Sequence, residues 1–305
     1  MDHFDAPVLM HPPLIHVAAA AENRGRVVLA ARTGAPHRIA ISAAAAVANA
    51  FESWLECLII EDPRVSALTA HSFAREVALS GRRIAPLSSV TIADHQNAES
   101  VRARRVLLAA AEKLSVRMEI KVVGETISDA LAAGCLECGP WNMIALAEPV
   151  QTADGPWLHR LLDEVVGATG LVFVGPKAAA SAGPVVVVVE DIERLPQMLR
   201  AAERLAMAGQ HKRIVLLLAC AKPERTFDLE GIVRLALPES GVPERVRVDI
   251  VGDAVPYGTV AETAEALRVI SGGFVVARNG GLTVPADGNI SALMLALKCP
   301  VLLVR

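Results

Sequence analysis

Short apolar runs alternate along this chain with longer segments in which apolar residues recur every three or four positions. Aliphatic runs of strand length, bounded by Gly, Pro or acidic residues, are typical of strands buried on both faces. Strands are therefore expected at 26–31, 55–60, 118–123, 141–147 and 171–174, and then at 184–189, 213–220, 246–251, 273–277 and 301–304.

The longer segments have the periodicity of amphipathic helices. They predict helices at 37–53, 66–79, 98–114, 128–136, 157–166, 196–207, 227–237 and 260–270, with a closing helix after residue 289. Strands that alternate with such helices indicate parallel sheets covered on both faces. Because this order occurs twice, the pattern predicts an α/β protein of two tandem sandwich domains. Each domain is expected to hold a five-stranded parallel sheet with helices on both faces.

Small and flexible residues mark the boundary between the two series. Residues 177–183 read Lys-Ala-Ala-Ala-Ser-Ala-Gly and form the best candidate linker. The predicted organisation is an N-terminal extension at 1–24, a first domain at 25–176 and a second domain at 184–305. The first domain is longer because of an insertion at about 80–97.

Composition narrows the partners that the chain is expected to have. Hydrophobic residues make up 53 % of the chain and aromatic residues 3 %, so the core must be aliphatic. The net charge of −3 predicts no attraction to nucleic acid or to an anionic membrane. No apolar run reaches the ~18 residues of a membrane helix, and the acidic N-terminus lacks a signal-peptide pattern. We therefore expect the protein in the cytoplasm.

The last stretch of the chain carries a family resemblance. Residues 272–305 run from a short strand through a glycine-containing loop and a helix to a final strand, Cys-Pro-Val-Leu-Leu-Val at 299–304. This ending resembles that of the universal stress protein family, and the elements before it fit that family twice. The resemblance covers nearly the whole chain after about residue 25. It implies a tandem-domain member with a degenerate nucleotide-binding motif.

The resemblance also nominates binding residues in the second series. The family carries an acidic residue after its first strand and a Gly-x2-Gly-x9-Gly-Ser/Thr loop after its fourth, where glycine amides and a helix N-terminus meet phosphate. Here the corresponding loop has seven residues, not nine, between Gly280 and Gly288. The nominated nucleotide-binding residues are Glu190, Asp191, Arg278, Gly280, Gly281, Gly288, Asn289 and Ser291, with ATP as the expected ligand.

The first series lacks this pattern. No acid follows its first strand, which leads into Arg32, and its later loop contains Glu148, Pro149 and Pro156. Proline lacks an amide donor, and a carboxylate repels phosphate. We expect no nucleotide in this half.

Other chemistry has little support in the sequence. The pair Cys135 and Cys138 stands where a predicted helix ends, whereas an activated Cys-x-x-Cys opens one. With one such pair and scattered histidines, no metal site is predicted. Cys57 and Cys220 lie in apolar runs and are expected to be buried. No catalytic nucleophile or acid–base set stands out, so no catalytic residue is nominated.

The resemblance thus implies a non-catalytic stress-response or regulatory protein that binds an adenine nucleotide in its second domain. Two alternatives stay open: a nucleotide-hydrolysing enzyme of the same α/β group, and a protein-interaction scaffold without a small ligand. The aliphatic closing strands, 171–174 and 301–304, would be sheet edges, which invite pairing. Such strands pair across a dimer in the family. We expect the two halves to pair through them as an internal pseudo-dimer, and the chain to form a further homodimer.

Overall fold

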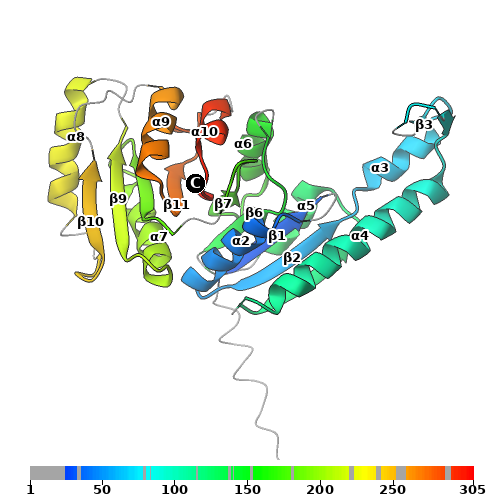
Figure 1. The fold of residues 1–305 in the computed structure, drawn as a ribbon, viewed down its shortest axis with the longest axis horizontal. Coiled ribbons are helices and arrows are strands. Elements are labelled where there is room, and N and C mark those ends of the chain that lie inside the picture. Colours follow the sequence, from blue (N-terminus) through cyan, green and yellow to red (C-terminus); the bar gives the residue numbers. More distant parts are fainter. Residues whose placement is uncertain are drawn as a thin grey trace, which may run out of the picture.

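A single ten-stranded sheet runs through the whole molecule (Figure 1). The computed structural model describes residues 25–32, 36–77, 80–82, 84–114, 116–136, 139, 141–151, 154–179, 182–219, 223–237, 242–251, 259–285 and 290–305. The strand order is β10-β9-β8-β11-β12-β7-β6-β1-β2-β5. A second, two-stranded sheet pairs β3 with β4.

Each half of the chain contributes five neighbouring parallel strands. The first half supplies β1 (Arg26–Ala31), β2 (Trp54–Ile60), β5 (Met118–Val123), β6 (Asn142–Leu146) and β7 (Gly170–Phe173). The second half supplies β8 (Val185–Val189), β9 (Arg213–Leu218), β10 (Arg247–Val251), β11 (Phe274–Arg278) and β12 (Val301–Val304). Every strand predicted from the apolar runs is present, and the α/β fold class is confirmed.

The two halves meet where β7 pairs with β12 in an antiparallel register, whereas the other described neighbours in the large sheet are parallel. Leu302 lies opposite Val172 and Val304 opposite Gly170. A Cβ atom on Gly170 would lie 2.7 Å from the carbonyl oxygen of Leu303, so only glycine fits at this position. The predicted pairing of the two closing strands is thus present. The two sheets predicted for separate domains are the halves of one continuous sheet.

Helices cover both faces of this sheet. One face packs against α2 (Arg38–Ala50), α4 (Ser89–Ala111), α7 (Leu195–Ala208) and α8 (Pro223–Ala236). The other packs against α5 (Ile127–Cys135), α6 (Gly155–Glu164), α9 (Val260–Ile270) and α10 (Ser291–Ala296). Alternate residues of the eight inner strands belong to opposite cores, which explains their continuous apolar runs, whereas the edge strands β5 and β10 alternate with polar residues. None of the described helices is both long enough and apolar enough to cross a membrane.

An arm leaves the first half between β2 and β5 and projects away from the sheet (Figure 1). It contains α3 (Pro63–Ala67), the 3-10 helix η1 (Leu68–Ala70), β3 (Arg75–Val77), β4 (Ile84–Pro86) and the first part of α4. The helix predicted at 66–79 is therefore wrong. The Asp62 side chain caps α3 at Arg64 N, so this helix begins three residues earlier than predicted. The described residues 68–77 are mostly exposed, and an isolated helix of this length is marginal.

Two of the cysteine expectations can be compared with the structure. Cys57 is fully buried, as predicted, whereas Cys220 lies outside the described residues. Cys135 is buried at the end of α5, where the sequence placed the end of a helix. Cys138 also lies outside the described residues.

Burial should make two thiols unreactive in the folded protein. Burial and the charge of Glu56 raise the pKa of Cys57 from 9.0 to about 12. Burial likewise raises the pKa of Cys299 to about 12. We expect iodoacetamide at pH 8 to spare both thiols in the folded chain and to label both in urea, as read by mass spectrometry of peptides. The neutral thiols stabilise the fold fully below pH 9, and this contribution falls as the pH rises toward 12. Equal labelling rates with and without urea would contradict this burial.

Candidate functional site

The two loops nominated in the second half lie on either side of a topological switch point. From β8 the chain moves to β9 on one side, while β11 lies on the other. In open α/β sheets, ligands bind at such a point, outside the carboxyl ends of the strands. The loop after β8 begins with Glu190 and the loop after β11 with Asn279. The fold therefore brings the nominated acids together with Gly280 and Gly281.

The carboxylate of Glu190 binds backbone amides of the loop that follows β11. Its Oε2 accepts a hydrogen bond from Leu282 N at 2.6 Å. Its Oε1 accepts from Thr283 N at 2.7 Å and from Thr283 Oγ1 at 2.6 Å. Thr283 is fully buried. Hydrogen bonds to an ionised acceptor are about twice as strong as neutral ones, so Glu190 acts as an internal anionic ligand of this loop.

Both glycines of the loop have structural reasons to be glycine. Gly280 has φ of 72°, a left-handed conformation that L side chains rarely adopt. Gly281 is approached so closely by Glu190 that an added Cβ would lie 1.9 Å from Oε2. The resemblance assigned Gly280 and Gly281 to phosphate binding. In the structure they instead allow the loop after β11 to pack closely against the Glu190 carboxylate.

The nominated arginine is also paired within the site. Arg278, the last residue of β11, forms an ion pair and hydrogen bond with Asp191 Oδ2. The other oxygen of Asp191 accepts from Arg194 N at 3.2 Å. About a third of each ion-pair side chain is exposed, 36 % for Arg278 and 31 % for Asp191. The Arg278 guanidinium is therefore paired with Asp191, while the second carboxylate of the crevice, Glu190, binds the loop after β11.

Three nominated residues cannot be placed in the same detail. Gly288 and Asn289 lie outside the described residues. Ser291 is the first residue of α10, a helix of six residues, and its side chain is also outside the described part. The structure thus brings together five of the eight nominated residues. It adds Leu282 and Thr283, which the sequence analysis did not single out.

In the first half, the loops after β1 and β6 correspond to the two loops just described. An acid from one of them also binds a backbone amide of the other. Glu148, after β6, accepts a hydrogen bond from Arg32 N, after β1, at 2.8 Å. The Arg32 guanidinium lies 4.4 Å from the ring centre of Trp157. In the second half the acid follows β8 and binds amides after β11, so the direction of the contact is reversed. A carboxylate across the crevice is common to both halves.

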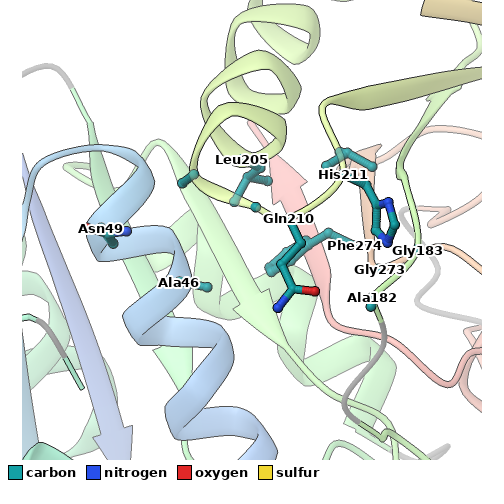
Figure 2. A pocket seen from close by; sticks show the side chains of 12 residues that line it. Ala46, Asn49, Ala182, Gly183, Leu205, Gln210, His211, Gly273 and Phe274 are labelled. Carbon is teal, nitrogen blue, oxygen red and sulfur yellow. The ribbon is translucent and has the colours of Figure 1, made fainter. Parts of the chain in front are cut away.

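Hollows also lie away from the two loops of the second half. A cleft of about 490 Å³ separates α2 from the end of α7, with Asn49 on one side and Gln210 and His211 on the other (Figure 2). It opens near the amino ends of β8 and β11, where the sheet places no nominated residue. A smaller cavity of about 170 Å³ lies beside α4 at the ends of β1 and β2. There Ser100 Oγ donates to Glu61 Oε1 at 2.5 Å.

Among the described residues, no group of three or more His, Cys, Asp or Glu side chains is placed to hold a metal ion. No family model matches the chain, and no curated protein matches it significantly. The universal-stress resemblance therefore stays a hypothesis, based on the order of elements, the closing strand and the degenerate loop.

A methyl group at residue 281 should disturb the closed loop. We expect Gly281→Ala to lower the free energy of unfolding by about 1–3 kcal/mol, because Glu190 must move and leave donors unsatisfied. Gly231, in α8, is the matched control, since an added Cβ there meets nothing within 4 Å. Gly231→Ala should be neutral or stabilising by up to ~1 kcal/mol. Equal effects of the two changes in urea unfolding would contradict the described approach of Glu190.

Proposed function

We propose that this chain is a universal-stress-like tandem protein of the cytoplasm that acts as a regulatory scaffold, without catalytic turnover. In this proposal the boundary at 177–183 separates two related halves, and the nucleotide loop of the second half is closed from within. The supporting observation is the Glu190 carboxylate on the amides of Leu282 and Thr283. Of the functions considered, the scaffold without a small ligand agrees best with this contact.

A nucleotide phosphate would compete with Glu190 for the same donors. Anion sites of this kind use free backbone N–H groups and positive charge. Here the two amides are occupied, and Arg278 is already paired with Asp191. A phosphate that entered would also lie near two carboxylates. Two like charges 4 Å apart repel by about 4 kcal/mol near a protein surface.

The same reasoning bears on the enzymatic alternative. Hydrolysis of a nucleotide requires its phosphates to be held and their charge neutralised. In this chain Arg278, nominated to meet phosphate, is already paired with Asp191, and Glu190 occupies amides of the loop. We therefore rank hydrolysis below the scaffold.

In this proposal the two halves of one chain pair with each other in the way that two subunits of a family dimer do. The strand pairing that joins family dimers corresponds here to the β7–β12 contact. A further homodimer would have to use another surface, because both of these strand edges are already paired.

Titration with ATP tests the proposal. Thermal melts of the purified chain would be recorded with increasing ATP and magnesium chloride, with sodium chloride of equal ionic strength as the control. We expect no change in melting temperature. A ligand at one hundred times its dissociation constant adds about 2.7 kcal/mol to the stability of the folded state, which a melt detects. A saturable rise would contradict the closed loop and favour nucleotide binding.

A further inference from the structure

The far end of the arm exposes large apolar side chains. They are Leu68 at 49 % exposure, Phe73 at 78 %, Val77 at 59 %, Ile84 at 67 % and Val90 at 68 %. These residues, on η1, β3, β4, the start of α4 and the turn at residue 73, are called the arm tip below. Single exposed apolar residues are ordinary, but a group of them marks an interaction surface.

The arm tip is convex and stands clear of the sheet. Figure 1 shows α3 and β3 at the outer end of α4, away from the other helices. All three residues of β3 are exposed, and its described strand partner is β4. A convex tip cannot enclose a small ligand. It can enter a soft surface or fill a pocket on a partner.

The part of the arm that precedes α4 also differs in charge from the rest of the chain. Residues 62–88 contain four arginines, no lysine and two acids, a net charge of +2 in a chain of net charge −3. The remainder therefore carries −5, the difference of the two values. Asp62 pairs with Arg64, and the exposed Arg75 and Arg82 outnumber the one exposed acid of β3, Glu76. The net charge of the whole chain predicts no attraction to an anionic membrane, but it does not reveal this local excess of positive charge.

We propose that the arm tip docks onto an anionic phospholipid surface. Phe73, Val77 and Ile84 enter the boundary between headgroups and acyl chains, while Arg75 and Arg82 contact lipid phosphates. Basic and apolar residues together are the signature of such surface binding, which needs no membrane-spanning helix. Cytoplasmic leaflets carry the required negative charge.

The geometry favours a lipid surface over a folded protein partner. The apolar side chains stand on a projecting tip instead of lining a groove, and a bilayer adapts to such a shape. An anionic surface repels the acidic body, and this repulsion fades beyond the Debye length of about 8–10 Å. The projecting arm lets the tip make contact while the body stays farther away. This proposal is independent of the closed loop and of the regulatory role.

Vesicle co-sedimentation tests the proposal with the full chain. Vesicles of phosphatidylcholine alone would be compared with vesicles containing about 30 % phosphatidylserine, which imitate an anionic leaflet. The apolar variant is Phe73→Ser with Ile84→Ser, and the charge variant is Arg75→Glu with Arg82→Glu. The matched control is Leu235→Ser with Val269→Ser, at residues 78 % and 74 % exposed on α8 and α9. Circular dichroism and melts would verify that each variant is folded.

We expect the unaltered chain to sediment with the anionic vesicles and not with the neutral ones, and to be released by high salt. The apolar and charge variants should each bind about tenfold more weakly, and the control as well as the unaltered chain. Failure of the unaltered chain to bind anionic vesicles would overturn the proposal in favour of an acidic protein partner. Undiminished binding by folded tip variants would also overturn it.

Discussion

Replacing both Leu302 and Val304 with lysine is expected to lower the free energy of unfolding by more than about 4 kcal/mol, or to prevent folding. Both side chains are buried, at 0 % and 2 % exposure, in the same core as Val172. They lie on β12, at the centre of the ten-stranded sheet. Lysine there would bury two unpaired charges, which costs far more than the loss of apolar contact.

Two comparisons keep this experiment interpretable. Leu302→Ala should fold but lose about 2–5 kcal/mol in urea unfolding, the usual cost of a core truncation. Val269→Lys, at a residue 74 % exposed, should change stability by less than about 0.5 kcal/mol. Size-exclusion chromatography would report the mass in solution. A double lysine variant with unchanged stability and mass would contradict the β7–β12 pairing.

Glu190→Ala is expected to destabilise the chain by about 2–4 kcal/mol, although Glu190 lies in a loop. The change removes the acceptor of three hydrogen bonds and leaves the buried Thr283 without that partner. Each unsatisfied buried donor costs about 1–3 kcal/mol, and the more exposed Leu282 amide can bind water.

The control for Glu190→Ala is an exposed acid that binds no backbone amide in the described structure. Glu119→Ala removes a carboxylate that is 60 % exposed and meets Lys121 at 3.4 Å, and it should cost less than about 1 kcal/mol. Chemical unfolding of the two variants gives the comparison. If the two costs were equal, Glu190 would not be an internal ligand of the loop.

Aliphatic patterning was sufficient to predict the ten strands of the large sheet, although it assigned them to two separate sheets. Val185–Val189 is apolar at every position because both faces of β8 are covered, and such runs are hard to confuse with a surface loop. The closing strands were predictable as partners because 171–174 and 301–304 each end a series and would otherwise be bare edges. The continuity of the sheet follows from this one pairing.

The arm was not predictable from local propensity. Residues 66–79 contain helix-favouring alanines, but helices in proteins are stabilised mostly by packing an apolar face. Phe73 and Val77 are 78 % and 59 % exposed, so the apolar side chains of this segment do not pack against the core. The Asp62–Pro63 start signal was present in the sequence and places α3 correctly.

The closed loop depends on a contact between residues more than ninety positions apart in the chain. The sequence indicated that Glu190 and Gly281 belong to neighbouring loops, but not that one fills the space beside the other. A glutamate has the reach and the charge to occupy an amide site that would otherwise take an anion. The hydroxyl of Thr283, two residues after Gly281, was the available signal for an acid-binding turn.

Hydrogen–deuterium exchange at the amides of Leu282 and Thr283 tests the central claim most directly. Exchange would be compared between the unaltered chain and Glu190→Ala, with the Asn279 amide, which donates to Val304 O at 3.0 Å, as an internal control. We predict slow exchange at both loop amides in the unaltered chain and faster exchange in the variant, with Asn279 protected in both. Rapid exchange at Leu282 and Thr283 in the unaltered chain would contradict a loop held closed by Glu190.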